Sequence, residues 1–125
     1  MYDKDNIFAR ILNNKTKCEK VYEDKYTLIF NDSHPVAPIH LLAIPKGTFR
    51  SFDHFTLHGS HNQILSFFIS IRKVIYQYKI DQSGYRLISN NGENAMQTVG
   101  HFHIHIVAGK KLGPLVVDDK YHTNK

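Results

Sequence analysis

The chain has 125 residues, 42% of them hydrophobic, and a formal net charge of +5 at pH 7, which allows one buried core and excludes two ordinary domains. The lysines are scattered rather than gathered in a basic stripe, and no common nucleic-acid-binding motif is recognisable, so we expect no nucleic-acid partner. No apolar run approaches the ~20 residues that cross a bilayer, and the amino-terminal residues are too charged for a signal peptide, so we expect no membrane partner and a cytoplasmic location.

The first part of the chain predicts a short helix followed by three strands. Apolar residues at positions 7, 8, 11 and 12 have helical spacing, and either Asp3 or Asp5 can cap this helix. Residues 20–23 and 26–30 flank a charged pair and indicate a strand hairpin. Residues 39–44 are apolar except for His40, and Pro45, which cannot donate to a sheet ladder, marks the end of this buried strand.

The second part predicts one long helix and two strands. From residue 61 to about residue 79, apolar side chains recur every three or four positions, as in an amphipathic helix. Residues 85–90 and 101–107 indicate strands, separated by a polar loop. This order predicts an α+β fold with an antiparallel sheet that carries its helices on one side. We expect one domain over residues 1–117 and a flexible polar tail over residues 118–125.

Three histidines alternate with apolar residues in the last predicted strand. Because successive side chains of a strand point to opposite faces, His101, His103 and His105 should share one face, while Phe102 and Ile104 take the other. Three imidazoles that charge together repel one another unless an anion lies among them. Protonated histidine supplies positive charge and neutral histidine supplies a nucleophilic nitrogen. The pattern therefore favours a phosphate-binding face.

Other interpretations of the histidines stay open. A lone histidine usually belongs to an ordinary polar surface, and a His-x-His pair on a strand can bind zinc. No acidic residue lies near this strand, and Cys18, the only cysteine, has no nearby partner with the spacing of a zinc site. We expect no metal and no cofactor. Supporting residues are His40, inside an apolar strand, and the amide and hydroxyl groups of Asn90, Gln97 and Thr98 before the histidines.

These residues resemble the histidine triad (HIT) superfamily, whose pattern is His-x-His-x-His-x-x with apolar intervening positions; here it is His101-Phe102-His103-Ile104-His105-Ile106-Val107. The resemblance covers about residues 6–115 in the family's order, including NIFARIL, IFND, PVAPIHLLAIPK, GYRLISNNG and QTVGHFHIHIVAGKKLGPL. The AGKKLGP ending is similar to the Hint branch of bacterial purine nucleoside phosphoramidases.

The resemblance implies a homodimer with a short N-terminal helix, one long helix and an antiparallel sheet. It also implies binding of purine nucleoside monophosphates and hydrolysis of phosphoramidates at the P–N bond through a nucleotidyl-histidine intermediate. His103 matches the nucleophile. His101 and His105 match the flanking positions that bind the phosphate and orient the nucleophile, and His40 matches a further histidine behind them. Nucleotide-binding positions match Asp32 and Ser33 at the ribose, Phe8, Ile11 and Phe30 at the base, and Asn90, Gln97 and Thr98 at the phosphate and leaving group.

The chain departs from the family pattern at three places. Thr98 stands where many Hint proteins have serine, Ser33 replaces an aliphatic residue, and Thr16-Lys17 replaces an aliphatic-proline pair near the base. Preference between adenine and guanine is therefore open. Two alternative functions also remain: a nucleotide-binding regulatory or scaffold protein with little turnover, and a dinucleoside polyphosphate hydrolase, against which the Hint-like ending argues.

Overall fold

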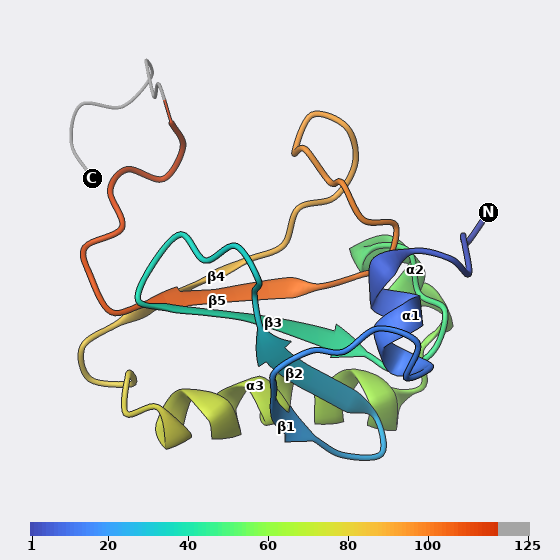
Figure 1. The fold of residues 1–125 in the computed structure, drawn as a ribbon, viewed down its shortest axis with the longest axis horizontal. Helices are drawn as coiled ribbons and strands as arrows, with labels where there is room; N and C mark the ends of the chain where they lie inside the picture. The colour runs from blue at the N-terminus through green and yellow to red at the C-terminus, as the bar shows by residue number, and fades with distance from the viewer. Residues whose placement is uncertain (118–125) are drawn as a thin grey trace.

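The computed structural model describes residues 1–117, and the tail expected to be flexible, residues 118–125, lies outside this described part. The helices and strands of the described residues follow one another in this order (Figure 1): α1 (Ile7–Leu12), β1 (Lys20–Glu23), β2 (Thr27–Asn31), β3 (Ile39–Pro45), α2 (Phe52–His58), α3 (His61–Gln77), β4 (Tyr85–Ile88) and β5 (Ile104–Ala108). No helix in residues 1–117 is long and apolar enough to cross a membrane.

The strands form one five-stranded sheet in the order β1-β2-β3-β5-β4, and every neighbouring pair is antiparallel. β3 lies in the middle, where the register pairs Leu42 with Phe30 of β2 and with His105 of β5. β4 pairs with β5 only and forms one edge of the sheet. The predicted α+β class and the antiparallel sheet are confirmed.

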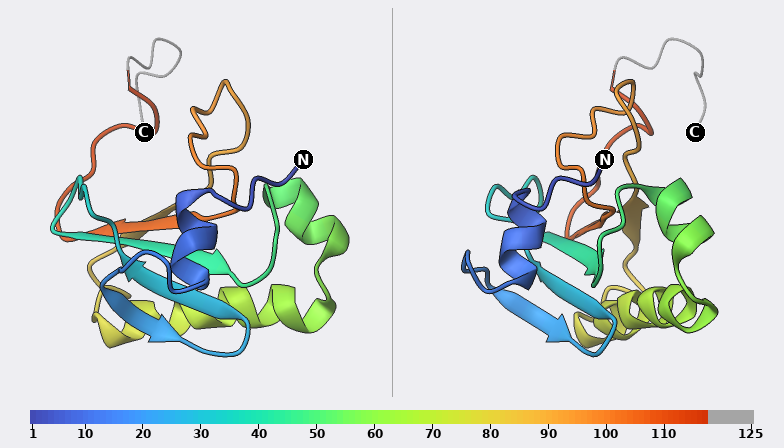
Figure 2. Two further views of the ribbon diagram at one scale, coloured as in Figure 1. Left: turned by 45° about the vertical axis from the view of Figure 1, so that its right-hand side comes forward. Right: turned by 90° about the vertical axis from the view of Figure 1, so that its right-hand side faces the viewer.

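Helices pack on both faces of the sheet, so the prediction that they lie on one side was wrong. The α3 face is covered by a core that includes Ile29, Leu41, Ala43, Ile104 and Ile106 of the strands with Phe67, Ile71, Val74 and Ile75 of α3. On the α1 face, a second core joins Phe8 and Ile11 of α1 to Leu28, Phe30, Leu42 and Ile44. Figure 2 shows α1 and α3 on different sides of β2 and β3. Period-2 alternation supplies apolar side chains to both faces of the central strands, which are buried on both sides.

Side-chain caps define the helix ends. The side chain of Asn6, not of Asp3 or Asp5 as predicted, accepts a hydrogen bond from the N–H of Ala9 and begins α1. α3 begins with a capping box in which Ser60 and Gln63 satisfy each other's backbone N–H groups. The sequence pattern missed α2, which has seven residues. It buries only Phe55, and a single buried position gives no apolar repeat.

β5 begins at Ile104, three residues later than predicted. The backbone N–H of Phe102 donates to the carbonyl of Phe49 at 2.7 Å instead of joining the sheet ladder. His101 and His103 therefore precede the strand, and only His105 lies within it. The predicted division of side chains between faces still holds, because Phe102 belongs to the α3 core and Phe8 of α1 contacts the rings of His101 and His103.

Candidate functional site

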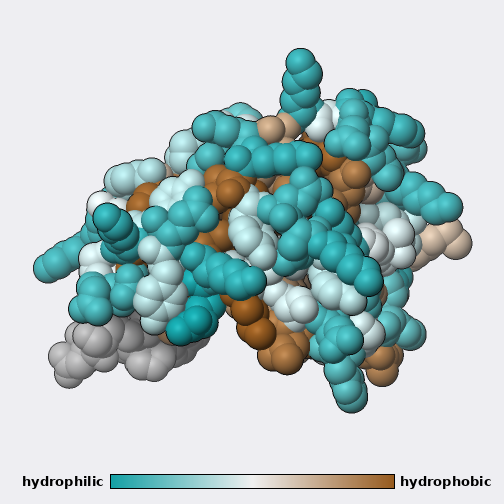
Figure 3. Space-filling view, turned by 90° about the horizontal axis from the view of Figure 1, so that it is seen from below, coloured by the Kyte–Doolittle hydropathy of each residue, from teal (hydrophilic) through white to brown (hydrophobic). Residues whose placement is uncertain are grey.

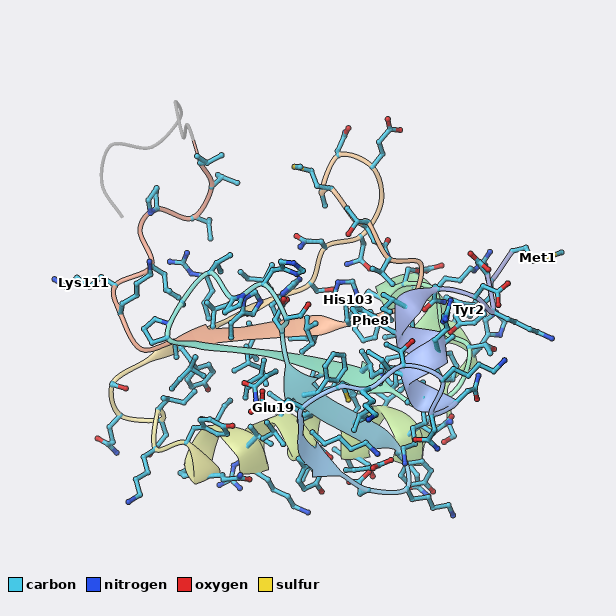
Figure 4. The ribbon with its side chains drawn as sticks, in the orientation of Figure 1. Met1, Tyr2, Phe8, Glu19, His103 and Lys111 are labelled. Atoms are coloured by element: carbon cyan, nitrogen blue, oxygen red, sulfur yellow. The ribbon has the colours of Figure 1, made fainter. Side chains whose placement is uncertain are left out.

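A cavity of about 1040 Å³ opens on the α1 face of the sheet. Sites for small organic molecules span roughly 300–1,000 Å³, so this cavity is large enough for a nucleotide-sized ligand. Its walls come from α1, residues 16–19, the end of β2 with the following loop, the loop between β4 and β5, and the two histidines His103 and His105. Among the labelled residues of Figure 4, Phe8 and His103 lie side by side where β5 begins.

His103 is held with one defined nitrogen free. Its Nδ1 lies 2.7 Å from the carbonyl oxygen of His101, and a carbonyl can only accept, so Nδ1 carries the proton. Because the ring is neutral and Nδ1 carries its proton, we assign the lone pair to Nε2. The ring is buried and stands edge to face against Phe8, with the centroids 5.0 Å apart. His103 therefore offers a neutral, oriented nucleophilic nitrogen in the wall of the cavity.

His105 belongs to a chain of hydrogen bonds with a defined direction. The N–H of Val36 donates to Nδ1 of His40, so the proton of neutral His40 is on Nε2. This Nε2 lies 2.9 Å from Nδ1 of His105 and 3.3 Å from Oδ2 of Asp32. Nδ1 of His105 therefore accepts, and the proton of neutral His105 is on Nε2. His103 offers a lone pair, whereas His105 offers an N–H.

His101 differs from the expectation that it binds phosphate. Its ring is completely buried, and both nitrogens are occupied: Nε2 lies 2.9 Å from the carbonyl oxygen of Pro45, and Nδ1 lies 2.6 Å from the hydroxyl of Tyr2. It lies beneath Tyr2 and Phe8 rather than in the cavity wall. The structure brings its main-chain carbonyl, not its side chain, into contact with the nucleophile candidate.

Burial keeps the three histidines neutral. It lowers the pKa of His101 to about 4, because the charged imidazolium loses its hydration. The pKa of His105 also falls to about 4, first through burial and then through the nearby His103 and His40. Burial likewise lowers the pKa of His103 below its ordinary value. One proton per ring, as the hydrogen bonds require, is thus the expected state at pH 7.

The structure brings most of the other predicted residues to the same cavity: Phe8, Ile11, Phe30, Asp32, Ser33, Asn90 and Thr98. Asp32 is fixed from two sides, since Oδ1 accepts from the N–H of His34 and Oδ2 faces His40. Gln97 is an exception. Its amide accepts from the N–H of Gly92 and donates to the carbonyls of Arg50 and Val99, so it holds the loop between β4 and β5 in shape.

The HIT domain family model matches residues 13–112. The chain belongs to the HIT domain family. A HIT-like protein of Rickettsia prowazekii is 42% identical over 116 residues, which cover 93% of this chain and 97% of the relative.

Solved HIT structures share the fold. A histidine triad protein from Clostridium difficile matches with a TM-score of 0.82 and 38% identity over 91% of this chain and 98% of that protein. A HIT family hydrolase from Legionella pneumophila matches with a TM-score of 0.81 and 28% identity over 87% and 96%. A histidine triad nucleotide-binding protein from Candida albicans matches with a TM-score of 0.73 and 27% identity over 81% and 72%. The predicted HIT-like fold is confirmed, in a family that contains hydrolases.

Several residues of this HIT domain's cavity were not predicted from the sequence. Cys18, Glu19, His34, Met96 and Val99 also line it. They lie in loops whose path over the sheet has no periodic signal. The contact between Tyr2 and His101 joins residues 99 positions apart, and a single tyrosine near an amino terminus gives no indication of such a contact.

One group of side chains in the described residues has the composition of a metal site. Asp32, His40 and His105 each place a ligand atom within 4.8 Å of the others. A metal ion would need lone pairs on both Nε2 of His40 and Nδ1 of His105. The N–H of Val36 occupies Nδ1 of His40 and so keeps the proton on Nε2. This hydrogen-bonded arrangement does not fit a resident metal ion.

Proposed function

We propose that the protein hydrolyses the P–N bond of purine nucleoside 5′-phosphoramidates through a nucleotidyl intermediate on His103, as in the Hint branch. The observation that carries the proposal is the hydrogen bond from Nδ1 of His103 to the carbonyl of His101, at 2.7 Å. This bond leaves Nε2, with its lone pair, as the reactive nitrogen of a ring that lines the cavity. A neutral imidazole with one fixed tautomer needs no prior loss of a proton before it attacks.

The reaction has two displacements. Nε2 of His103 forms a bond to the α-phosphorus, and the bond from that phosphorus to the amine nitrogen breaks. The amine leaves with the electron pair of that bond and takes up a proton. Water then attacks the same phosphorus, the bond to His103 breaks, and the nucleoside monophosphate leaves while water loses a proton. Two such steps replace one difficult displacement.

His105 supplies the hydrogen-bond donor in this scheme. Its Nε2–H belongs to a ring that lines the cavity beside His103, with ring centroids 5.2 Å apart. Such a donor stabilises the negative charge that develops on a phosphoryl oxygen. His40 and Asp32 keep His105 in the required tautomer through the 2.9 Å and 3.3 Å contacts. His101 holds the nucleophile by its carbonyl.

The nucleoside is proposed to lie against the rest of the cavity. Asp32 and Ser33 follow β2 at the rim, where carboxylate and hydroxyl oxygens suit ribose hydroxyls. Phe8, Ile11 and Phe30 form an apolar wall that suits a purine. Asn90 and Thr98 are proposed to contact the phosphate or the leaving amine, while Gln97 supports their loop.

The proposed enzyme is a homodimer that associates through β4 and α3. β4 is an edge strand, and it and α3 expose large apolar side chains: Tyr85 and Leu87 on β4, and Phe68, Ile69 and Tyr76 on α3. Figure 3 shows hydrophobic surface among the hydrophilic side chains when the molecule is seen from below. A small domain gains buried apolar surface by pairing.

Sedimentation equilibrium tests the homodimer and should give a mass of twice 14.5 kDa. Leu87→Lys, which places a charge on the exposed edge strand, should shift the protein toward monomer. A wild-type protein that is monomeric at micromolar concentration would contradict this assembly.

A panel of substrates tests the activity. Adenosine and guanosine phosphoramidates should be hydrolysed much faster than diadenosine polyphosphates. Protein quenched during turnover and kept under alkaline conditions should carry the nucleotide on the peptide that contains His103. An adduct on another residue would contradict the mechanism, and faster hydrolysis of the polyphosphates would replace the proposed substrate class. Tight nucleotide binding without turnover of any substrate would favour the scaffold alternative.

A further inference from the structure

The amino-terminal segment reaches the histidine segment through Tyr2. The hydroxyl of Tyr2 lies 2.6 Å from Nδ1 of His101, and the two rings meet edge to face with centroids 5.6 Å apart. Figure 4 shows Tyr2 at the same end of the molecule as Phe8 and His103, where α1 lies. Tyr2 does not line the proposed nucleotide cavity, and the two displacements described above make no use of it.

The direction of this hydrogen bond follows from the second partner of His101. Nε2 of His101 lies 2.9 Å from the carbonyl oxygen of Pro45, which can only accept. The ring proton is therefore on Nε2, Nδ1 is an acceptor, and the hydroxyl of Tyr2 is the donor. Because the ring of His101 is completely buried, the hydroxyl of Tyr2 is the partner that satisfies its Nδ1.

His101 in turn controls the nucleophile through its backbone. The carbonyl of His101 accepts the proton of Nδ1 of His103 at 2.7 Å, and this contact leaves the reactive lone pair on Nε2. The ring of His101 and its carbonyl belong to one residue fixed by Pro45 on one side and Tyr2 on the other. The peptide group that contains this carbonyl is also held by the N–H of Phe102, which donates to the carbonyl of Phe49 at 2.7 Å. If the ring of His101 turns, the carbonyl that orients His103 loses one of these supports and its position becomes less well defined.

We propose that Tyr2 is a positioning residue for the nucleophile: its hydroxyl fixes His101, and the carbonyl of His101 fixes the tautomer and orientation of His103. This inference rests on the proposed function of His103. It assigns a role in the rate of the chemical step to residues 1–6, none of which lines the cavity. Its effect should therefore be on kcat and not on KM.

Removal of the hydroxyl alone tests the proposal. Tyr2→Phe keeps the ring that packs on His101 and removes only the donor. With an adenosine phosphoramidate, kcat should fall roughly five- to tenfold, as expected for one neutral hydrogen bond, while KM changes less than twofold. In ¹⁵N-resolved NMR of the free enzyme, the signal of the unprotonated Nδ1 of His101 should shift, because it loses its donor while the carbonyl of Pro45 keeps the ring proton on Nε2. The Nδ1–H of His103 should exchange with water several times faster.

Tyr26→Phe is the matched control, because it makes the same chemical change at the turn between β1 and β2 and should leave kcat and both imidazole signals unchanged. A Tyr2→Phe enzyme with normal kcat, or with only a raised KM, overturns the proposal. The NMR measurement needs no substrate. If wild type hydrolyses no phosphoramidate, the proposed function fails, and unchanged His101 and His103 signals in Tyr2→Phe would separately refute the positioning role.

Discussion

The two faces of the sheet are built from the same strands but differ in what covers them. On the α3 face, alternate strand residues meet a continuous apolar core that also includes Phe55, Phe67 and Phe102. On the α1 face, a helix of six residues covers only part of the sheet. The rest of that face is a cavity of about 1040 Å³ walled by His103, His105, Asp32 and polar loops.

This difference separates stability from chemistry. The closed face removes apolar surface from water, so its side chains contribute to the free energy of unfolding. The open face leaves polar groups accessible but holds His103, His105 and Asp32 by partners within the protein, as His40 holds His105. Substitutions on the two faces should therefore have separable effects.

The largest effect is expected on the open face. His103→Ala should lower kcat by at least about 10³-fold, equivalent to roughly 4 kcal/mol of activation free energy, because the nucleophile is removed. Binding of a nucleoside monophosphate should change little, since the apolar wall and Asp32 remain. Steady-state kinetics measures kcat, and isothermal titration calorimetry measures the binding of the nucleoside monophosphate. His61→Ala, at the exposed start of α3, is the control, and near-normal turnover by His103→Ala would falsify the mechanism.

The converse substitution lies on the closed face. Ile71 is 2% exposed within the α3 core, and Ile71→Ala should lower the free energy of unfolding by roughly 2–5 kcal/mol through lost burial and the resulting cavity. Turnover by the folded fraction should stay close to that of wild type. Urea denaturation and kinetics on the same preparation test this separation, which fails if kcat falls in parallel with stability.

Acid should destabilise the protein through the histidines of the open face. The pKa of buried His101 is about 4 in the folded state, against about 6.5 in an unfolded chain. Between these values the unfolded state binds more protons, so stability present above pH 6.5 is lost as the pH falls toward 4, up to about 3 kcal/mol for this residue. His105 acts in the same direction. Urea midpoints across this range should show the loss, and His101→Gln should flatten it; an unchanged slope in that variant would contradict the assignment to His101.

The smallest effect is a change in labelling. Cys18 is the only cysteine and lines the cavity, and burial raises the pKa of its thiol, so alkylation at mildly alkaline pH should be slow. A nucleoside monophosphate at ten times its Kd should slow the reaction by about tenfold, in proportion to the free fraction. Mass spectrometry measures the rate, with urea-unfolded protein as the control. Equal rates with and without nucleotide would indicate that the ligand lies elsewhere.

Periodicity explains what the sequence could predict. The spacing of apolar residues identified α3, and the alternation around the histidines correctly separated Phe102 and Ile104 from His103. Which face α1 covers depends on the path of loops, so alternation alone could not predict helices on both sides. The residues that cover His101 also escaped prediction, because Tyr2 meets it from the other end of the chain. Gln97 was recognisable as a polar loop residue, but its partners Arg50 and Val99 were not.

The alternation of histidine and apolar residues also bears on how β5 finds its place during folding. In the native register, Ile104 and Ile106 of β5 stand opposite Ala43 and Leu41 of β3. A slip by one residue would turn the isoleucines toward the cavity and His105 into the α3 core, where an imidazole has no hydrogen-bond partner. The histidines therefore disfavour the misaligned pairing, and the residues proposed for catalysis also help to specify which strand alignment survives as the sheet forms.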